Sequence, residues 1–515
     1  MIDNIVTVLN SKPLETNTGF YNNQKYQIDI VFDNLQGNTF SLNLASMVSL
    51  EIEEDSRQWF KKATLTIKNP NNVFEQKISS SDTPNQYYKF RNDGRDLVYI
   101  VVKPINDDTL SQSNLQLDYD VWGMAYTFCI YDRKEMLNGE SSLQKELKLY
   151  LWEFDYQIFT ETNVSWSTVE MLPTSIIPAQ ATDEQKLVPT GNAIKSLITK
   201  ILSQYSTPTF SKDWDPGASK IFFTSFANGS AEDTLDYLFK KFVSAKTNDP
   251  GLLSRTRYTK KWQLRSYASI FDDALDKQSK TAGKLQREIF TISSQGGERS
   301  NEYVFNATES TVPGYSIKYQ NTNYSDPSRS LIKKFSITDM AAIDSAYEMV
   351  TSPCYSNNLK DKTFQVDFKN NTIENVKKYI DETYTKKLQM YTPPSTLVTL
   401  NKPKLEARSL NTIYSYSPDK VSRLAESRNM LLAAALFFNT SINFTALGSP
   451  VREIGTFISI KNTTGGLINE FINKLTGQWL VYKVVHRFSG AEYTNDVTAV
   501  RLHANASLGV KDNIV

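Results

Sequence analysis

The chain has only two histidines, and both lie near its C-terminal end. Histidine changes its charge near neutral pH, which makes it a common proton carrier in active sites and a common metal ligand. His486 and His503 fall on segments whose alternating apolar residues predict β-strands. Because His486 has the strand parity of Leu480 and Phe488, we expect it to pack within the wall of a β-structure. The spacing supplies no third ligand that would complete a metal site with the two histidines.

Carboxylates gather at two places that could do chemistry. The acidic segment 51–55, which contains Glu51, Glu53, Glu54 and Asp55, follows a predicted strand to its end and suits a solvated face or the basic groups of a partner. Asp213-Trp214-Asp215 has a spacing that could hold a divalent cation. The Pro216-Gly217 pair that follows favours a loop anchored by its tryptophan. A carboxylate pair for glycoside hydrolysis depends on a spatial separation that the sequence does not define.

The familiar catalytic signatures are missing from the sequence. It contains no phosphate-binding G-x-x-x-x-G-K-[ST], no dinucleotide-binding G-x-G-x-x-G, no H-E-x-x-H and no G-x-S-x-G. We therefore predict that the protein is not an enzyme and uses neither a cofactor nor a metal.

Positive and negative charges are almost balanced. The 57 lysines and arginines face 56 aspartates and glutamates, which gives a net charge of +1. A general nucleic-acid-binding protein normally has a strong basic excess. The best local candidate for contact with a nucleic acid or an acidic partner is the stretch from Arg255 to Lys261, beside Trp262. At this overall charge, a solvated β-hairpin is the favoured interpretation.

Cysteine usage and hydropathy indicate a protein made in the cytoplasm. Cys129 and Cys354 are the only cysteines, too few for a disulfide framework, and Cys129 lies in a predicted strand where we expect a buried thiol. The N-terminal residues show no signal peptide. The longest apolar run, Met430 to Phe438, is far shorter than the ~18 residues that span a bilayer. We expect no membrane anchor.

Hydrophobic periodicity predicts a mainly β protein with α+β parts. Segments 48–53 and 62–68 alternate apolar with polar residues, 97–103 is a β-branched run, and 122–130 places its large apolar residues on one face. Several short strands separated by turns are typical of a sandwich or barrel.

The chain changes character near residue 186. Apolar residues at helical spacing predict a helix from 194 to 205, and a capping box from Ser230 to Asp233 opens a second helix. Short predicted strands at 221–223 and 262–264 complete a small α/β unit.

A length of 515 residues predicts three or four domains. Residues 1–185 are expected to form an N-terminal β-barrel-like domain, and 186–272 a small α/β connector. Residues 273–415 are expected to be a mixed, polar insertion or peripheral region that begins with a linker over 273–300. Residues 416–515 are expected to form a C-terminal helix and a hairpin that completes a barrel. The barrels could be built from discontinuous segments.

The C-terminal hundred residues carry the clearest pattern. A predicted helix over about 420–438 and a stop at Gly448-Ser449-Pro450 lead to a short strand at 456–460. Gly477 then opens a long strand that includes residues 479–488, and a turn leads back into a strand over 496–503. The pattern predicts an extended terminal hairpin.

This hairpin resembles that of the baseplate hub proteins of contractile-tailed phages and related injection machines, a group that includes the type VI spike hubs. The hairpin of that family runs from a glycine and a large aromatic residue through an apolar strand with a histidine to a tyrosine turn and a final arginine. The matching residues here are Gly477, Trp479, Tyr482, His486, Phe488, Tyr493 and Arg501. The segment 52–67 and the order of elements from 192 to 264 are also similar to the family.

The resemblance implies two β-barrel-like tube domains plus a small α/β unit and a polar insertion, in a homotrimer that forms a pseudo-hexameric ring. Such a ring would adapt the six-fold tail tube to the three-fold central spike, and DNA would pass through its channel only as cargo. The implied partners are the tail spike protein, the tail tube or tube-initiator protein and the baseplate wedge proteins. The protein would be part of the virion, in the tail baseplate, assembled in the host cytoplasm.

Two other classes of function remain open alternatives. The 27 tyrosines and 7 tryptophans would suit a receptor- or carbohydrate-binding tail protein, which would need exposed aromatic platforms. A polysaccharide-cleaving enzyme would need a pair of carboxylates in one cleft. The hub interpretation is favoured because it accounts for both the terminal hairpin and the missing catalytic motifs.

Overall fold

The computed structural model describes a large part of the chain outside the segment 340–439. The described residues are 17–21, 24–34, 39–68, 77–78, 87–88, 96–105, 124–137, 145–173, 176, 180–182, 185–218, 220–224, 229–246, 251–255, 261–266, 269–270, 287–294, 303–310, 332–339, 440–448, 450, 452–462 and 477–501. The helix expected over about 420–438, His503 and Cys354 lie outside these residues.

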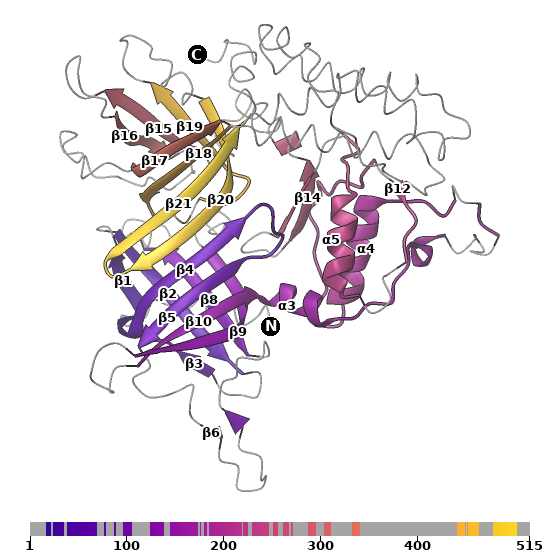
Figure 1. Ribbon diagram of the computed structural model, residues 1–515, viewed down its shortest axis with the longest axis horizontal. Helices are drawn as coiled ribbons and strands as arrows, with labels where there is room; N and C mark the ends of the chain where they lie inside the picture. The colour runs from indigo at the N-terminus through magenta and orange to yellow at the C-terminus, as the bar shows by residue number, and fades with distance from the viewer. Residues whose placement is uncertain are drawn as a thin grey trace, which may run out of the picture.

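The fold is mainly β, as predicted, and is built on one large curled sheet (Figure 1). Its N-terminal part is antiparallel, in the order β1-β2-β8-β9-β10-β5-β4, with β3 paired to β2. A 3-10 turn, η2 (Leu44–Ser46), precedes β4, and β6 (Lys77–Ile78) pairs with β7 (Tyr87–Tyr88) outside this sheet. The strands of the N-terminal part are β1 (Thr18–Tyr21), β2 (Gln24–Asp33), β3 (Thr39–Ser41), β4 (Met47–Asp55), β5 (Lys62–Lys68), β8 (Leu97–Pro104), β9 (Met124–Leu137) and β10 (Lys145–Glu153).

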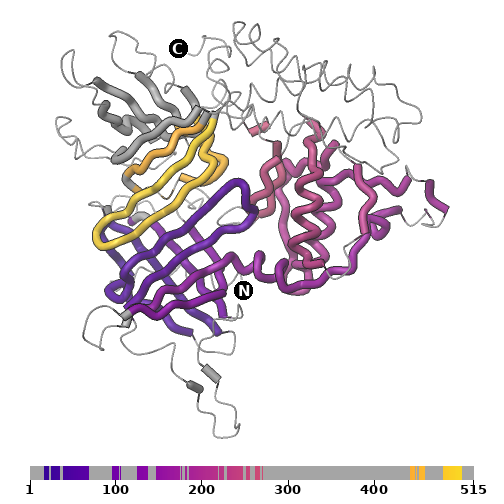
Figure 2. Tube along the Cα trace, in the orientation of Figure 1, coloured from indigo at the N-terminus to yellow at the C-terminus, as the bar shows by residue number. Residues whose placement is uncertain are grey.

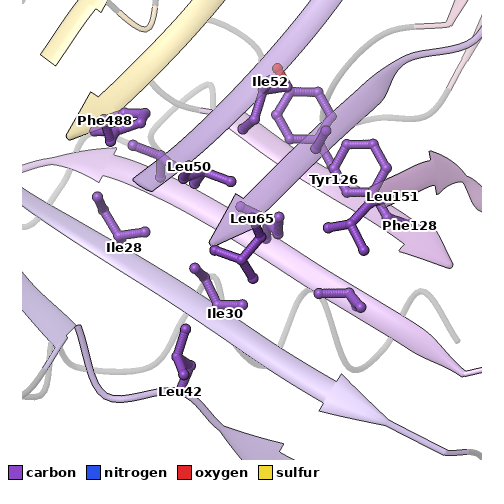
Figure 3. Close-up of a cluster of buried hydrophobic side chains, with 14 of the residues drawn as sticks. Ile28, Ile30, Leu42, Leu50, Ile52, Leu65, Tyr126, Phe128, Leu151 and Phe488 are labelled. Atoms are coloured by element: carbon purple, nitrogen blue, oxygen red, sulfur yellow. The ribbon is translucent and has the colours of Figure 1, made fainter. Parts of the chain in front are cut away.

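The concave side of the N-terminal part holds the main hydrophobic core (Figure 3). Alternation along β4 and β5 turns Leu50, Ile52 and Leu65 inward, each with no exposed surface. Strand β8 differs because Tyr99 and Val101 are also buried, on the opposite face. A strand buried on both faces needs no polar alternation, which explains the continuous apolar run at 97–103.

The C-terminal part of the sheet has the order β16-β15-β19-β20-β21-β18-β17. All pairs are antiparallel except β15 with β19, which run parallel. Residues 287–294 form a strand of this part, so the expected linker over 273–300 is wrong there. The strands are β15 (Arg287–Ser294), β16 (Tyr303–Ser310), β17 (Ile332–Asp339), β18 (Thr440–Leu447), β19 (Phe457–Asn462), β20 (Gly477–Ser489) and β21 (Glu492–Arg501).

A small α/β unit lies beside the sheet, with α4 and α5 next to each other (Figure 2). The predicted capping box is present: the Ser230 hydroxyl accepts from the Asp233 amide, and the Asp233 carboxylate accepts from the Ser230 amide. The unit and its connection comprise α3 (Phe154–Glu161), a 3-10 turn η3 (Thr168–Met171), β11 (Val188–Pro189), α4 (Thr190–Leu202), β12 (Lys220–Ile221), α5 (Ala231–Lys240), β13 (Gly251–Arg255) and β14 (Trp262–Ser266).

Two local expectations in this unit are wrong at their ends. Helix α4 stops at Leu202, so Tyr205 lies beyond its apolar face and is 50% exposed. The strand expected at 221–223 is shorter, and Phe222 is 46% exposed. At the basic stretch, β13 and β14 pair with Arg255 opposite Trp262, which confirms the strands on either side of the expected hairpin turn. Residues 256–260 of that stretch lie outside the described residues.

Candidate functional site: a hairpin shared by two parts of the sheet

Strand β20 changes its neighbour halfway along its length. Residues 477–480 pair with β19, and residues 483–489 pair with β4 on the same side. On its other side β20 pairs with β21, to form the predicted terminal hairpin. In Figure 1 this hairpin runs from the C-terminal part of the sheet into the N-terminal part. Strand β20 therefore joins segments more than 400 residues apart in the sequence into one sheet.

Tyr482 occupies the point where the neighbour changes. It is the additional residue of a β-bulge, because the register with β21 shifts between Val481 and Lys483. Its carbonyl oxygen accepts from the Ser56 amide at 2.9 Å, just beyond β4, while the Val481 amide donates to the Thr456 carbonyl at 2.8 Å, just before β19. The backbone at the switch is thus bonded to both parts of the sheet. Burial raises the pKa of Tyr482 to about 12, so its phenol stays neutral.

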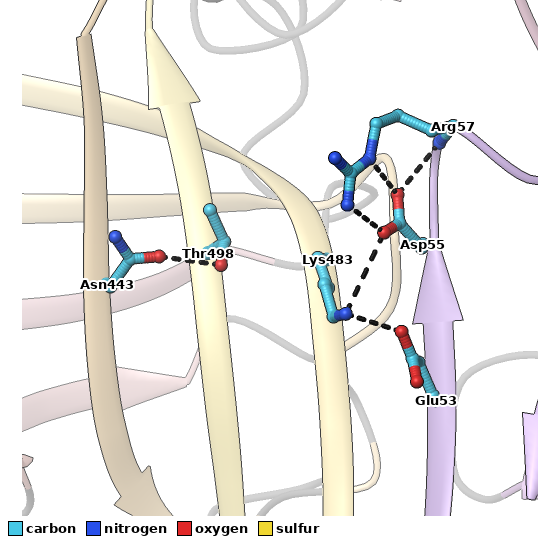
Figure 4. A network of polar contacts seen from close by, with 6 residues as sticks. All are labelled: Glu53, Asp55, Arg57, Asn443, Lys483 and Thr498. Carbon is cyan, nitrogen blue, oxygen red and sulfur yellow. Dashed lines mark hydrogen bonds and ion pairs between the residues drawn. The ribbon is translucent and has the colours of Figure 1, made fainter. Parts of the chain in front are cut away.

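A charged network crosses the seam between β4 and β20 on its outer side (Figure 4). The Asp55 carboxylate accepts from the Arg57 amide at 2.9 Å and from the Arg57 side chain at 2.6 and 3.1 Å. Lys483 pairs with Glu53 and lies 3.8 Å from Asp55. Arg487 pairs with Glu51, in the next outward-facing position.

Part of the acidic segment is buried, which corrects the expectation of a solvated face. Glu54 has no exposed surface and accepts a 2.6 Å hydrogen bond from the Tyr126 hydroxyl, and Asp55 is 3% exposed. Glu54 lies on the inner face of β4 with Leu50 and Ile52, where a carboxyl group is stable only with hydrogen-bond partners supplied by other strands.

We expect Asp55→Asn to destabilise the protein by about 1.5 kcal/mol, the scale of a charge-assisted hydrogen bond. Burial raises the pKa of Asp55, but the hydrogen bonds from Arg57 and the charges of Arg57 and Lys483 outweigh it and hold the pKa below its ordinary value of 3.8. A carboxylate with a depressed pKa stabilises the fold above its unfolded pKa and loses that contribution as pH falls through its folded pKa.

Thermal melting of the two proteins between pH 2 and 8 measures this effect. The difference in melting temperature should be constant from pH 5 to 8 and shrink below pH 3.8. Glu53→Gln serves as the matched control, because the ion pair of Glu53 with Lys483 is partly exposed and should contribute less than about 1 kcal/mol. A difference that grows on acidification would contradict the assignment.

The tip of the hairpin is seated in the core of the N-terminal part. The rings of Phe488 and Tyr493 stack on each other at 4.0 Å. Tyr21 meets Phe488 edge-on at 5.4 Å, and Tyr26 meets Tyr493 in the same way at 5.4 Å. These rings come from β1, β2 and the hairpin, so the tip packs against the edge of the sheet farthest from β4 in strand order.

A buried polar chain leads away from these rings. Arg452 donates to the Asn495 amide oxygen at 2.7 Å, and the Asn495 amide nitrogen lies 2.8 Å from His486 Nδ1. The Tyr493 hydroxyl also lies 2.8 Å from His486 Nδ1. All four side chains are almost completely buried. His486 therefore has a packed position in the β wall, as its parity suggested.

The remaining residues of the family pattern have simpler surroundings. Trp479 is completely buried, and Gly477 pairs with Ile460 at the start of β20. Arg501 pairs with Thr440 at the end of β21, and its side chain lies outside the described part of the structure. Sequence analysis missed Arg452 and Asn495, because nothing in their local pattern signals a shared polar chain.

In the Asp213-Trp214-Asp215 segment, Asp215 and Trp214 form hydrogen bonds that stabilise the fold. The Asp215 carboxylate accepts from the Gly217 and Ala245 amides at 2.9 and 3.0 Å and from the Ser244 hydroxyl at 2.5 Å. The Trp214 indole donates to the Gly191 carbonyl at 3.1 Å, which confirms the tryptophan-anchored loop. Among the described residues, no group of three His, Cys, Asp or Glu side chains is placed to hold a metal ion.

Cys129 is buried, and burial raises the pKa of its thiol to about 12, which leaves it unreactive at neutral pH.

None of the helices that the structure describes is long and apolar enough to cross a membrane.

No family model matches the sequence, and no curated protein matches it. Among solved structures, the chain is similar to a tail protein from Neisseria meningitidis MC58, at 8% identity over 94% of this chain and 99% of that chain, with a TM-score of 0.42. A prophage MuSo2 tail protein from Shewanella oneidensis gives 8% identity, coverage of 93% and 99%, and a TM-score of 0.42.

A third similar structure is an Escherichia coli component of the type VI secretion system that is itself structurally similar to the T4 tail proteins gp27 and gp5. It gives 7% identity over 88% of this chain and 73% of that chain, with a TM-score of 0.32. The structures similar to this chain thus include two tail proteins, one of them from a prophage, and a component of the type VI secretion system.

Proposed function

We propose that this chain is a structural baseplate hub protein of a phage tail. Three chains would form a pseudo-hexameric ring that joins a six-fold tail tube to a three-fold central spike and surrounds the ejection channel. The observation that carries the proposal is strand β20, which pairs with β19 and then with β4. It links two parts of a curled sheet within each chain, so a trimer would present six sheet units.

A ring that bears force between tube and spike needs subunits whose two parts cannot rotate against each other. Rotation here would break the β4–β20 ladder from Lys483 to Ser489, the seam of charges around Asp55 and the seating of Phe488. Several independent contacts would have to fail together, which favours a rigid subunit. The sequence resemblance of the hairpin to the hub family supports the same function.

The proposed role is architectural and does not involve catalysis. His486, Asp215 and Cys129 are the described groups that could most readily do chemistry, and each is buried. Asp215 and His486 form hydrogen bonds with other residues of the fold, and the Cys129 thiol is protonated at neutral pH. Spike, tube or tube-initiator and wedge proteins are the proposed partners, and DNA is proposed only as cargo in the channel.

Light scattering of the purified protein tests the ring. We expect a mass of three times the 58.6 kDa protomer, alone or after addition of the spike protein encoded with it. Electron micrographs of the complex should show a ring with three-fold symmetry and six density lobes. A protein that stays monomeric with the spike, at concentrations well above the micromolar range, would contradict the hub function.

A further inference from the structure

Four partly exposed aromatic rings form a continuous strip where the sheet meets the α/β unit. The aromatic strip consists of Tyr150, Tyr131, Trp152 and Tyr156. Tyr131 stacks on Trp152 at 3.9 Å and lies 6.3 Å from Tyr150, and Trp152 meets Tyr156 edge-on at 4.9 Å. Its residues come from β9, β10 and the first turn of α3.

The aromatic strip is not part of the main hydrophobic core. On β10 the core takes Leu147, Leu149 and Leu151, so Tyr150 and Trp152 point to the outer face. Tyr131 is the additional residue of a β-bulge between β9 and β10, and it is 38% exposed. Bulges re-aim side chains, and large partly exposed aromatic residues are characteristic of the centres of interfaces.

One end of the strip is acidic. The Tyr156 hydroxyl lies beside the Glu232 carboxylate on α5, and Asp236, one turn further along, lies beside the Trp59 indole. Burial and the neighbouring charges of Asp236 and Asp233 raise the pKa of Glu232. Lys240 is the cation that acts on Asp236. Glu232 and Asp236 are both partly exposed on the same face of α5, four residues apart, so this end of the strip presents two carboxylates to a cation.

The rings in and beside the strip already attract cations. The Lys148 ammonium lies 5.3 Å from the centre of the Tyr150 ring, and that of Lys62 lies 5.2 Å from the centre of Phe60. Phe60 in turn stacks on Tyr156 at 3.4 Å. A guanidinium group suits such a surface best, because it can stack on a ring and bond a carboxylate at the same time.

We propose that the aromatic strip, together with Glu232 and Asp236, is a docking site for an extended, arginine-bearing segment of a partner protein. The partner's apolar and aromatic groups would pack on Tyr131 and Trp152, and an arginine would reach the two carboxylates beside Tyr156. The proposal rests on the described side chains alone and does not depend on the hub function.

Fluorescence anisotropy with labelled peptides tests this site on the full-length protein. The probes are a peptide of alternating glycine and arginine and its lysine counterpart, at low salt, where charge contacts are strongest. We expect the arginine peptide to bind about threefold more tightly. The double variant E232Q/D236N should weaken its binding about tenfold, and Tyr131→Ser about threefold.

Matched controls keep the test specific. Glu135→Gln removes an exposed acid from β9, and Tyr205→Ser removes an exposed tyrosine outside the strip, and neither should change binding. If the double variant does not fold, as judged by its melting temperature, Tyr131→Ser tests the strip alone. Equal binding of both peptides, or binding that no strip variant weakens, would overturn the proposal.

A neutral oligosaccharide, maltohexaose, tests whether the aromatic strip is instead a glycan-binding surface. Sugar rings stack on aromatic faces without needing a carboxylate pair. Binding of maltohexaose that Tyr131→Ser abolishes, with no detectable binding of the arginine peptide, would overturn the proposal in favour of a glycan surface. Binding of the arginine peptide without binding of the sugar would support it.

Discussion

Replacing Gly448 by alanine is expected to destabilise the terminal hairpin by about 3 kcal/mol, the upper range for overpacking a buried site. The added methyl group would lie 2.1 to 2.4 Å from three atoms of the Tyr493 ring. That ring cannot move aside, because it stacks on Phe488 and meets Tyr26. The Gly448 amide also donates to the Tyr493 carbonyl at 2.7 Å, which fixes the backbone at this distance.

Hydrogen exchange measures the stability that the hairpin loses when Gly448 is replaced by alanine. Amide protection in β18 and β21 should fall about a hundredfold, whereas amides in α4 and α5 should change little. Gly490→Ala is the matched control. Gly490 has a positive φ of +58° but no atom within 4 Å of the added methyl, so its cost is the backbone strain of about 1 kcal/mol. Equal effects of the two substitutions would contradict a steric role for Gly448.

Much of the fold follows from local patterns in the sequence. Alternation at 48–53 and 62–68 predicted β4 and β5, and the capping box at Ser230 predicted the start of α5. Such signals depend on neighbouring residues alone. They were unreliable at the ends of elements, where Tyr205 was wrongly included in a helix. They also failed to predict β15, because the polar residues around it suggested a linker.

The pairing of strands could not be predicted in the same way. Parity assigns the faces of β4 and β20 but does not say that they lie side by side across more than 400 residues. For this reason the burial of Glu54 and Asp55 was missed, since both depend on partners brought by other strands, such as Tyr126 and Lys483. The assigned domain boundaries and the roles of the hairpin residues in assembly remain predictions.

Gly448 was predicted only as part of a stop signal, although it has a second physical role. A glycine near a proline reads as a turn from sequence, and its close approach to a ring 45 positions later becomes visible only in three dimensions. His486 is the opposite case. Its parity predicted the correct face, but the identity of its bonding partners required the positions of Arg452 and Asn495.

The arrangement around His486 determines its protonation state. Arg452 can only donate, so its bond fixes the oxygen of the Asn495 amide toward Arg452 and the nitrogen toward His486. His486 Nδ1 must then accept, which places the ring proton on Nε2. With only two histidines in the chain, selective ¹⁵N-histidine labelling should give two sets of signals, and the buried ring should show the Nε2–H tautomer at neutral pH.

We expect His486→Phe to destabilise the hairpin by about 3 kcal/mol, because it keeps a ring of similar size but removes the acceptor shared by two buried donors. The loss should appear as reduced amide protection in β20 and β21. Arg487→Ala, at the next position, removes two half-exposed ion pairs, with Glu51 and Asp496, and should cost less than about 1 kcal/mol.

The comparison of these two neighbours distinguishes two ways of holding the hairpin on the N-terminal part of the sheet. If the outer charges held it, Arg487→Ala would be the more damaging change. The geometry favours the buried side, where Phe488 and Tyr493 pack in the core and the His486 acceptor fixes the donors beside them. A hairpin held in this way would resist high salt, which screens the ion pairs of Arg487 but does not reach the buried His486.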